Sequence, residues 1–316
     1  MEEFKEEDLR RLLKPAVNSS KEDNGKVTVI GGSSLFHGAP ILALKTASRI
    51  VDMVFFSSPE PSVGKVAERI KSRLGAFIWV PFDEIGEYIQ KSDAVLIGPG
   101  LMRYHKKIPN SKFPASPAGG QIPNKFQIIK SQILNKLDRV GQQTKKITET
   151  LLQQFPQKQW VIDAGSLQVM EAKYIPPGAI LTPNKREFQM LFGTKAVCYD
   201  NTYHHSEEKL GEMIREKARK YNCVVVLKGV KTFVCSPEKC VVVTGGNAGL
   251  TKGGTGDVLA GLTVGLAAKN EPFLAACAAS FILKKAADEL HKKVGFAYSA
   301  DDLAQKIPEV LGKYWR

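Results

Sequence analysis

Long apolar runs are missing from this sequence of 316 residues. No stretch approaches the roughly 18 apolar residues that a membrane-spanning helix needs. The first residues, MEEFKEEDLRRLLK, are charged and contain no apolar core of a secretory signal. We therefore expect a cytoplasmic protein that does not bind membranes.

Cysteine is also scarce. The five cysteines form no Cys-x-x-Cys pair, and their odd number argues against a full disulfide framework (Cys198, Cys223, Cys235, Cys240 and Cys277). No histidine lies at zinc-ligand spacing from them. We expect free thiols, although Cys235 and Cys240 flank a predicted hairpin turn and could approach each other.

Acidic residues are nearly absent from residues 101–159. This segment holds eleven Lys or Arg against Asp138 and Glu149, which gives +9 of the net charge of +13. Such charge could bind the phosphates of nucleic acid, but the segment has few aromatic side chains for base stacking. We do not expect nucleic-acid binding and interpret the segment as a solvated or intersubunit surface, which could also steer an anionic ligand.

Proline and glycine crowd residues 103–124 of this segment. They predict an irregular insertion at about 103–140 in a single domain that spans residues 1–316. Within the insertion, Phe126, Ile129, Ile133 and Leu137 have helical spacing. A second helix is expected over 144–155.

The rest of the chain alternates short apolar strands with helices. Before them, residues 1–20 suggest an amphipathic helix and a polar turn. We expect strands over 26–31, 52–57, 77–80, 93–98, 160–164, 179–182 and 224–227, then a hairpin of 232–235 with 241–244, and helices over 257–268, 272–293 and 299–311. This alternation predicts an α/β fold with a central, mostly parallel sheet and helices on both faces.

The stretch Asn247–Gly265, NAGLTKGGTGDVLAGLTVG, joins a glycine-rich loop to an apolar helix. Glycines let several backbone N–H groups approach one anion, and a helix N-terminus adds positive potential there. Asp257 stands at the junction, where a carboxylate could take the proton of a hydroxyl that attacks phosphorus. The alternative is that Asp257 only caps the helix.

Six motifs follow one another in a fixed order, each at the end of a predicted strand. They are VIGGSSLFHGAP (29–40), LIGPGL (96–101), VIDAGSL (161–167), LTPNKREF (181–188), VVLKGVKT (225–232) and GNAGLTKGGTGDVLAG (246–261). The set resembles the NAD(P)H-hydrate dehydratases, which are ribokinase-like enzymes. The resemblance covers nearly all of residues 18–295 apart from the insertion.

The resemblance implies a hydro-lyase that repairs the S form of hydrated NADH or NADPH. ATP or ADP would phosphorylate the C6 hydroxyl, and elimination of phosphate would restore the dihydropyridine. It implies Mg²⁺ as a cofactor, a homo-oligomer, and a separate epimerase as functional partner for the R form. The donor, ATP or ADP, is left open.

The resemblance also assigns residues. It implies Asp257 as the catalytic base, which also contacts the substrate, and Glu187 near the metal. The further matched positions are Ala39, Gly100 and Asn184 for the hydrated dinucleotide; Lys228, Gly229, Val230, Lys231, Thr232 and Gly256 for the nucleotide; and Gly253, Gly254, Thr255 and Gly256 for the anion hole.

Asn184 departs from the family pattern, which usually has His after Thr-Pro. The pair Asn184 and Glu187 is instead what many ribokinase-like vitamin kinases show. A hydroxymethylpyrimidine or thiazole kinase therefore stays open as the alternative enzyme. Asp163 could bind magnesium or a hydroxyl, or could serve only the turn after its strand.

Overall fold

The computed structural model describes residues 1–103, 137–193 and 207–315. Within these residues, ten strands form one sheet in the order β1-β10-β9-β8-β7-β6-β5-β2-β3-β4. All pairings of these strands are parallel except the two that β9 makes with β8 and β10. The strands are β1 (Glu2–Glu3), β2 (Lys26–Ile30), β3 (Met53–Ser57), β4 (Ile78–Trp79), β5 (Ala94–Ile97), β6 (Gln159–Ile162), β7 (Ile180–Leu181), β8 (Val224–Leu227), β9 (Thr232–Cys235) and β10 (Cys240–Val243).

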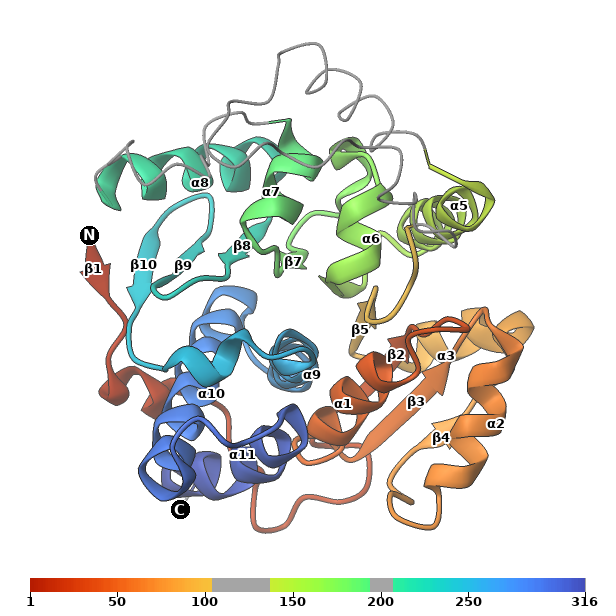
Figure 1. Cartoon of the computed structure of the whole chain (residues 1–316), viewed down its shortest axis with the longest axis horizontal. Helices are drawn as coiled ribbons and strands as arrows, with labels where there is room; N and C mark the ends of the chain where they lie inside the picture. The colour runs from red at the N-terminus through yellow and green to blue at the C-terminus, as the bar shows by residue number, and fades with distance from the viewer. Residues whose placement is uncertain (104–136, 194–206, 316) are drawn as a thin grey trace, which may run out of the picture.

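Helices cover both faces of the sheet (Figure 1). One face carries α1 (Gly38–Ala47), α2 (Pro61–Ile70), α9 (Thr255–Ala267), α10 (Pro272–Val294) and α11 (Ala300–Trp315). The other carries α3 (Ile85–Lys91), α5 (Arg139–Gln154), α6 (Ala164–Val169), α7 (Lys185–Phe192) and α8 (Glu207–Tyr221). Short 3₁₀ helices are η1 (Glu6–Arg11), η2 (Phe82–Glu84), η4 (Ala172–Tyr174) and η5 (Ala248–Thr251).

Alternate residues of each strand supply the two cores. In β5, Leu96 packs into the core on the α9 face, whereas Val95 and Ile97 pack into the opposite core. Because successive side chains of a strand point to opposite faces, a fully apolar strand requires cover on both sides. The apolar runs seen in the sequence are therefore buried parallel strands.

Helix α9 lies near the middle of the molecule, beside α1 and α10 (Figure 1). Most of its residues are buried, and it has no polar stripe along its length. A helix that is apolar on all sides must be surrounded by protein. Its surroundings therefore fix the position of its N-terminal turn, which carries Asp257.

The α/β class, with a mostly parallel sheet covered on both faces, is confirmed. The predicted hairpin and the long C-terminal helices are also present. Ser299 and Asp302 cap α11 reciprocally, since the Ser299 N–H donates to the Asp302 carboxylate and the Asp302 N–H to the Ser299 hydroxyl. The helix expected over 144–155 is α5, which begins earlier, at Arg139.

The prediction for the N-terminus is confirmed only in part. A short 3₁₀ helix with Leu9 buried is present over Glu6–Arg11, but Glu2 and Glu3 before it pair in parallel with β10. The backbone of β10 would otherwise present unpaired N–H and C=O groups at the edge of the sheet. Pairing at a distant edge is a tertiary contact, which local helical spacing does not reveal.

The expectation of free thiols is wrong for one pair, since Cys235 and Cys240 form a disulfide across the β9–β10 turn. They are register partners in the antiparallel ladder, which brings their side chains together. Cys223 and Cys277 are free and buried.

The basic insertion falls mostly outside the described residues, so the single-domain assignment with an insertion stays a prediction. The helix expected around Phe126, Ile129 and Ile133 lies outside them as well. None of the helices in the described ranges combines the length and the apolar composition that crossing a membrane requires.

Candidate active site

Two glycine-rich loops meet at the carboxyl edge of the sheet. Gly98 has a φ of +125°, and a Cβ there would lie 1.8 Å from the carbonyl oxygen of Asp163. A Cβ on Gly100 would lie 2.5 Å from the carbonyl oxygen of Phe36. The loop before α1 and the loop after β5 therefore touch. The same Cβ on Gly100 would lie 3.0 Å from Pro40 Cδ, so Gly100 is close to the first turn of α1, which holds Ala39. The two predicted substrate contacts thus belong to neighbouring segments.

The N-terminal turn of α9 lies in a tightly held loop. Gly254 is the N-cap residue and has a φ of +95°. The N-terminus of the helix therefore has no side-chain cap. The Thr255 hydroxyl donates to the carbonyl oxygens of Leu250 (2.7 Å) and Lys252 (2.9 Å). Asp257 is the third residue of the helix, so it is not the N-cap. The interpretation of Asp257 as a simple cap is therefore set aside.

Lys228 lies beside this turn and faces two carboxylates. Its Nζ is 2.8 Å from Asp163 Oδ1 and 3.8 Å from Glu187 Oε2. Asp163 Oδ1 also accepts a hydrogen bond of 2.8 Å from the Thr182 hydroxyl. A Cβ on Gly256 would lie 3.5 Å from the same Nζ. The lysine predicted to bind nucleotide thus stands between two acids and the predicted anion hole.

This cluster raises the pKa of Asp257 to about 7. Burial is the largest cause, and the negative charges of Asp163 and Glu187 add to it, while Lys228 opposes them. Burial acts to lower the pKa of Lys228, but the charges of Asp163 and Glu187 outweigh it and raise that pKa above its ordinary value. At neutral pH, Asp257 can therefore exchange a proton beside a fixed cation.

Asn184 and Glu187 form a reciprocal cap at the start of α7. The Glu187 N–H donates to Asn184 Oδ1 (2.9 Å), and the Asn184 N–H donates to Glu187 Oε2 (2.8 Å). The Asn184 side chain therefore has a structural role that needs no substrate. Its predicted substrate contact remains a prediction.

Glu187 was the predicted metal ligand. Its side chain is 5% exposed, and its other carboxylate oxygen accepts from the Gln168 amide (3.1 Å). Within the described ranges, no group of three His, Cys, Asp or Glu residues is arranged to hold a metal ion. These donors do not fit a Mg²⁺ ion held by protein alone. No step of the reaction is therefore assigned to a metal at Glu187.

A cavity of about 540 Å³ lies between the loop after β8, the loop after β10 and the start of α9. Of the predicted residues, it is lined by Asn184, Lys228, Gly229, Val230, Thr232, Thr255 and Gly256. Lys231 is not among the lining residues, and its ammonium pairs with Glu207 on α8. The sequence interpretation missed Gly245, Lys284 and Ser280, which also line the cavity.

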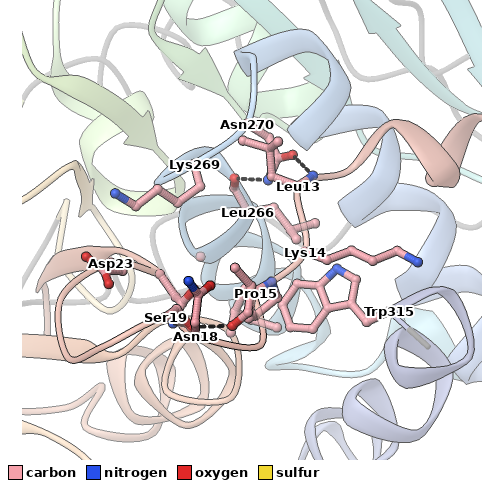
Figure 2. Close-up of a pocket in the computed structure, with 14 residues that line it drawn as sticks. Leu13, Lys14, Pro15, Asn18, Ser19, Asp23, Leu266, Lys269, Asn270 and Trp315 are labelled. Atoms are coloured by element: carbon pink, nitrogen blue, oxygen red, sulfur yellow. Dashed lines mark hydrogen bonds between the residues drawn. The ribbon is translucent and has the colours of Figure 1, made fainter.

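A second cavity of about 400 Å³ lies at the opposite end of α9, around Leu266 and Asn270 (Figure 2). The N-terminal segment closes one side, where the Leu13 N–H donates to Asn270 Oδ1 (2.8 Å). None of the residues that the sequence assigned to a site lines it. Because Asp257 lies at the other end of the helix, this cavity is separate from the candidate active site.

Comparisons with known proteins agree with this geometry. A family model described as NAD(P)H-hydrate dehydratase matches residues 137–309, more than half of the chain. The chain is 34% identical over 308 residues to a bifunctional NAD(P)H-hydrate repair enzyme of Methanocaldococcus jannaschii, covering 96% of this chain and 51% of the relative. It is 27% identical to an ADP-dependent (S)-NAD(P)H-hydrate dehydratase of Nitrosopumilus maritimus, and the match covers 93% of this chain and 90% of that relative. The chain thus spans about half the length of the first of these relatives.

Solved structures share the fold. A ribokinase-like protein of Enterococcus faecalis superposes with a TM-score of 0.75 at 21% identity, covering 99% of this chain and 96% of that one. An ADP/ATP-dependent NAD(P)H-hydrate dehydratase of Bacillus subtilis, co-crystallised with ATP/Mg²⁺, superposes with a TM-score of 0.68 at 22% identity, covering 99% and 98%. The ribokinase-like architecture is therefore confirmed.

Proposed function

We propose that this chain, which belongs to the NAD(P)H-hydrate dehydratase family, dehydrates the S form of hydrated NADH or NADPH. An adenine nucleotide is the phosphoryl donor. The terminal phosphoryl group passes to the C6 hydroxyl of the substrate. The C6–O bond then breaks, phosphate leaves, and loss of a proton from C5 restores the double bond. The products are NADH or NADPH, phosphate and the shortened nucleotide.

The position of Asp257 carries this proposal. Its carboxyl lies in the first turn of α9, has a pKa of about 7, and is close to the Lys228 ammonium. A base with a pKa near the working pH is suited to take the proton of an attacking hydroxyl. The N–H groups of the same helical turn and the nearby ammonium stabilise the charge on the transferred phosphoryl group.

The 540 Å³ cavity is the proposed nucleotide site, since five of the six predicted nucleotide-binding residues line it: Lys228, Gly229, Val230, Thr232 and Gly256. The relative from Nitrosopumilus maritimus is named as ADP-dependent, so we propose ADP as the donor. When bound, Mg²⁺ would offset phosphate charge. The protein groups described above do not fit this ion, so no step of the reaction is assigned to it.

The test is recovery of absorbance at 340 nm from hydrated NADH, with magnesium and either ADP or ATP. The proposal expects recovery together with free phosphate. A stable phosphoester without recovered absorbance would instead indicate the vitamin-kinase alternative. Asn184 was the clue for that alternative, and its side chain is now accounted for by the cap of α7.

We expect kcat/KM to rise with pH and to level off above an apparent pKa near 7, because Asp257 must be ionised to act as a base. Burial and the Asp163 charge both raise this pKa, so Asp163→Asn is expected to move the rise to lower pH. Lys228→Met removes the charge that lowers it and is expected to move the rise to higher pH. The measurement is kcat/KM from pH 5 to 9 for each variant. Identical profiles for the wild type and both variants would contradict the assignment.

Two further properties are part of the proposal. Use of the R form requires an epimerase, and the bifunctional names of several curated relatives support that link. We also propose that the chain assembles as a homo-oligomer, which light scattering on the purified protein tests directly. A monomeric mass at micromolar concentration would refute the proposed homo-oligomer.

A further inference from the structure

A buried lysine on α10 connects the two loops that form the walls of the proposed nucleotide cavity. Lys284 is 4% exposed. Its Nζ donates to the carbonyl oxygens of Val230 (2.5 Å), Gly245 (3.0 Å) and Gly229 (3.5 Å). Gly229 and Val230 belong to the loop after β8, and Gly245 to the loop after β10. One ammonium therefore holds both loops.

These contacts account for all three N–H groups of the ammonium. Burying a charged group is costly unless it is fully hydrogen-bonded, and burial lowers the pKa of Lys284. A methionine would fill the same space without that cost. The position of the ammonium, rather than the packing of the side chain, explains why a lysine serves here.

The next turn of α10 holds the same loop from a second point. Asp288 accepts hydrogen bonds from the Gly246 N–H (2.9 Å) and the Asn247 amide (3.2 Å). Asn247 Oδ1 in turn accepts from the Tyr298 hydroxyl (2.7 Å). Gly245 and Gly246 both have positive φ values, so this turn is held in a conformation that few other residues adopt. Helix α10 thus fixes the loop that leads into the anion hole.

The loop after β8 needs such support because it is open to solvent. Gly229 and Lys231 are exposed, and Val230 is 94% exposed. A cavity wall built from exposed backbone must be ordered when a ligand binds, which weakens binding unless the wall is already fixed. Lys284 fixes it to a helix that is mostly buried in the core between Phe273 and Ala287.

We propose that Lys284 is a positioning residue that sets the width of the nucleotide cavity by tying Gly229, Val230 and Gly245 to α10. This role rests on the proposed function only in that the cavity takes an adenine nucleotide. Lys284 orders the site for the nucleotide and takes no part in proton transfer at Asp257.

The experiment compares Lys284→Met with Lys306→Met. Lys306 on α11 is also buried, at 6% exposure, but its ammonium pairs with Glu289 and Glu309 and it does not line the cavity. We expect Lys284→Met to raise KM for the nucleotide and Kd for ADP by about tenfold or more, with kcat and KM for the hydrated dinucleotide within about threefold. Lys306→Met is expected to lower Tm without raising either nucleotide constant.

Lys284→Arg keeps the donors and is expected to restore part of the ADP affinity. If Lys284→Met does not fold, Lys284→Gln, whose amide is shorter, is expected to raise the same two constants. Unchanged nucleotide constants in the folded variant would overturn the proposal and leave Lys284 a structural residue.

Direct binding of ADP and ATP separates this proposal from the proposed reaction. A wild-type protein that binds nucleotide but does not dehydrate the substrate would refute the reaction, and the Kd values would still decide the role of Lys284. A wild-type protein that binds neither nucleotide would overturn both proposals.

Discussion

Asp257→Asn is expected to lower kcat by about 10³-fold or more, while Kd for ADP stays within about threefold. The amide has nearly the shape of the carboxyl but cannot accept the proton of the attacking hydroxyl. Gly256 and Thr255 line the proposed nucleotide cavity, whereas Asp257 is not among its lining residues. Steady-state kinetics at 340 nm and calorimetric titration with ADP measure the two quantities.

Asp301→Asn is the matched control for this variant. Asp301 is an exposed carboxylate in the first turn of α11, paired with Lys45, and lies outside the candidate site. We expect it to retain the wild-type rate. A near-normal kcat in Asp257→Asn would show that Asp257 is not the base. Asp163, the neighbouring carboxylate, would then be the next candidate.

Gly254→Ala is expected to lower kcat/KM by about 10²-fold or more. The N-cap has a φ of +95°, which a residue with a side chain adopts only at a cost of about 1 kcal/mol or more. The added Cβ would also lie 2.5 Å from Leu42 Cδ1 and 2.9 Å from Ala300 Cβ. We expect relief of this overlap to move the N-terminal turn of α9 and to misalign the N–H groups that we propose as the anion hole. Removal of one such donor costs about 10²–10³ in rate in other enzymes.

Gly253→Ala gives the comparison within the same loop. A Cβ at Gly253 would meet nothing within 4 Å, and its φ is not in the left-handed range. Its loss in kcat/KM is therefore expected to be far smaller than that of Gly254→Ala. Equal losses in both variants would mean that the loop responds to any side chain and that the N-cap conformation is not the cause. Circular dichroism checks that both variants are folded.

The sequence carried enough information for the central sheet, because its strands are continuous apolar runs that only a doubly covered parallel sheet can bury. It also placed Asp257 at the start of a buried helix, since a glycine-rich loop followed by an apolar helix is a local pattern. The capping box at Ser299 was equally visible, because both partners lie within one turn. These features depend on neighbours in the chain.

Features that depend on distant neighbours were not predictable in the same way. The pairing of Lys228 with Asp163 joins the ends of two different strands, and the sequence left Asp163 with an open role. Lys284 follows the apolar first half of α10 and lies among buried residues on both sides, which could have indicated a buried charge, but the sequence does not reveal its three carbonyl partners. The edge strand Glu2–Glu3 needs β10 to exist before it can form.

Among the strands that the structure describes, β9 alone runs against its neighbours, and this has a consequence for how the proposed nucleotide site forms during folding. A parallel crossover would carry the chain far from the edge before returning, usually through a helix. The β9–β10 hairpin instead returns the chain, within residues 228–245, to the carboxyl end of the strands that it left after β8. The two loops that line the cavity are therefore joined by contacts between residues close in sequence. Such local contacts cost little loop-closure entropy and form quickly. The two walls of the cavity can therefore form together, and α10, later in the chain, then fixes their spacing.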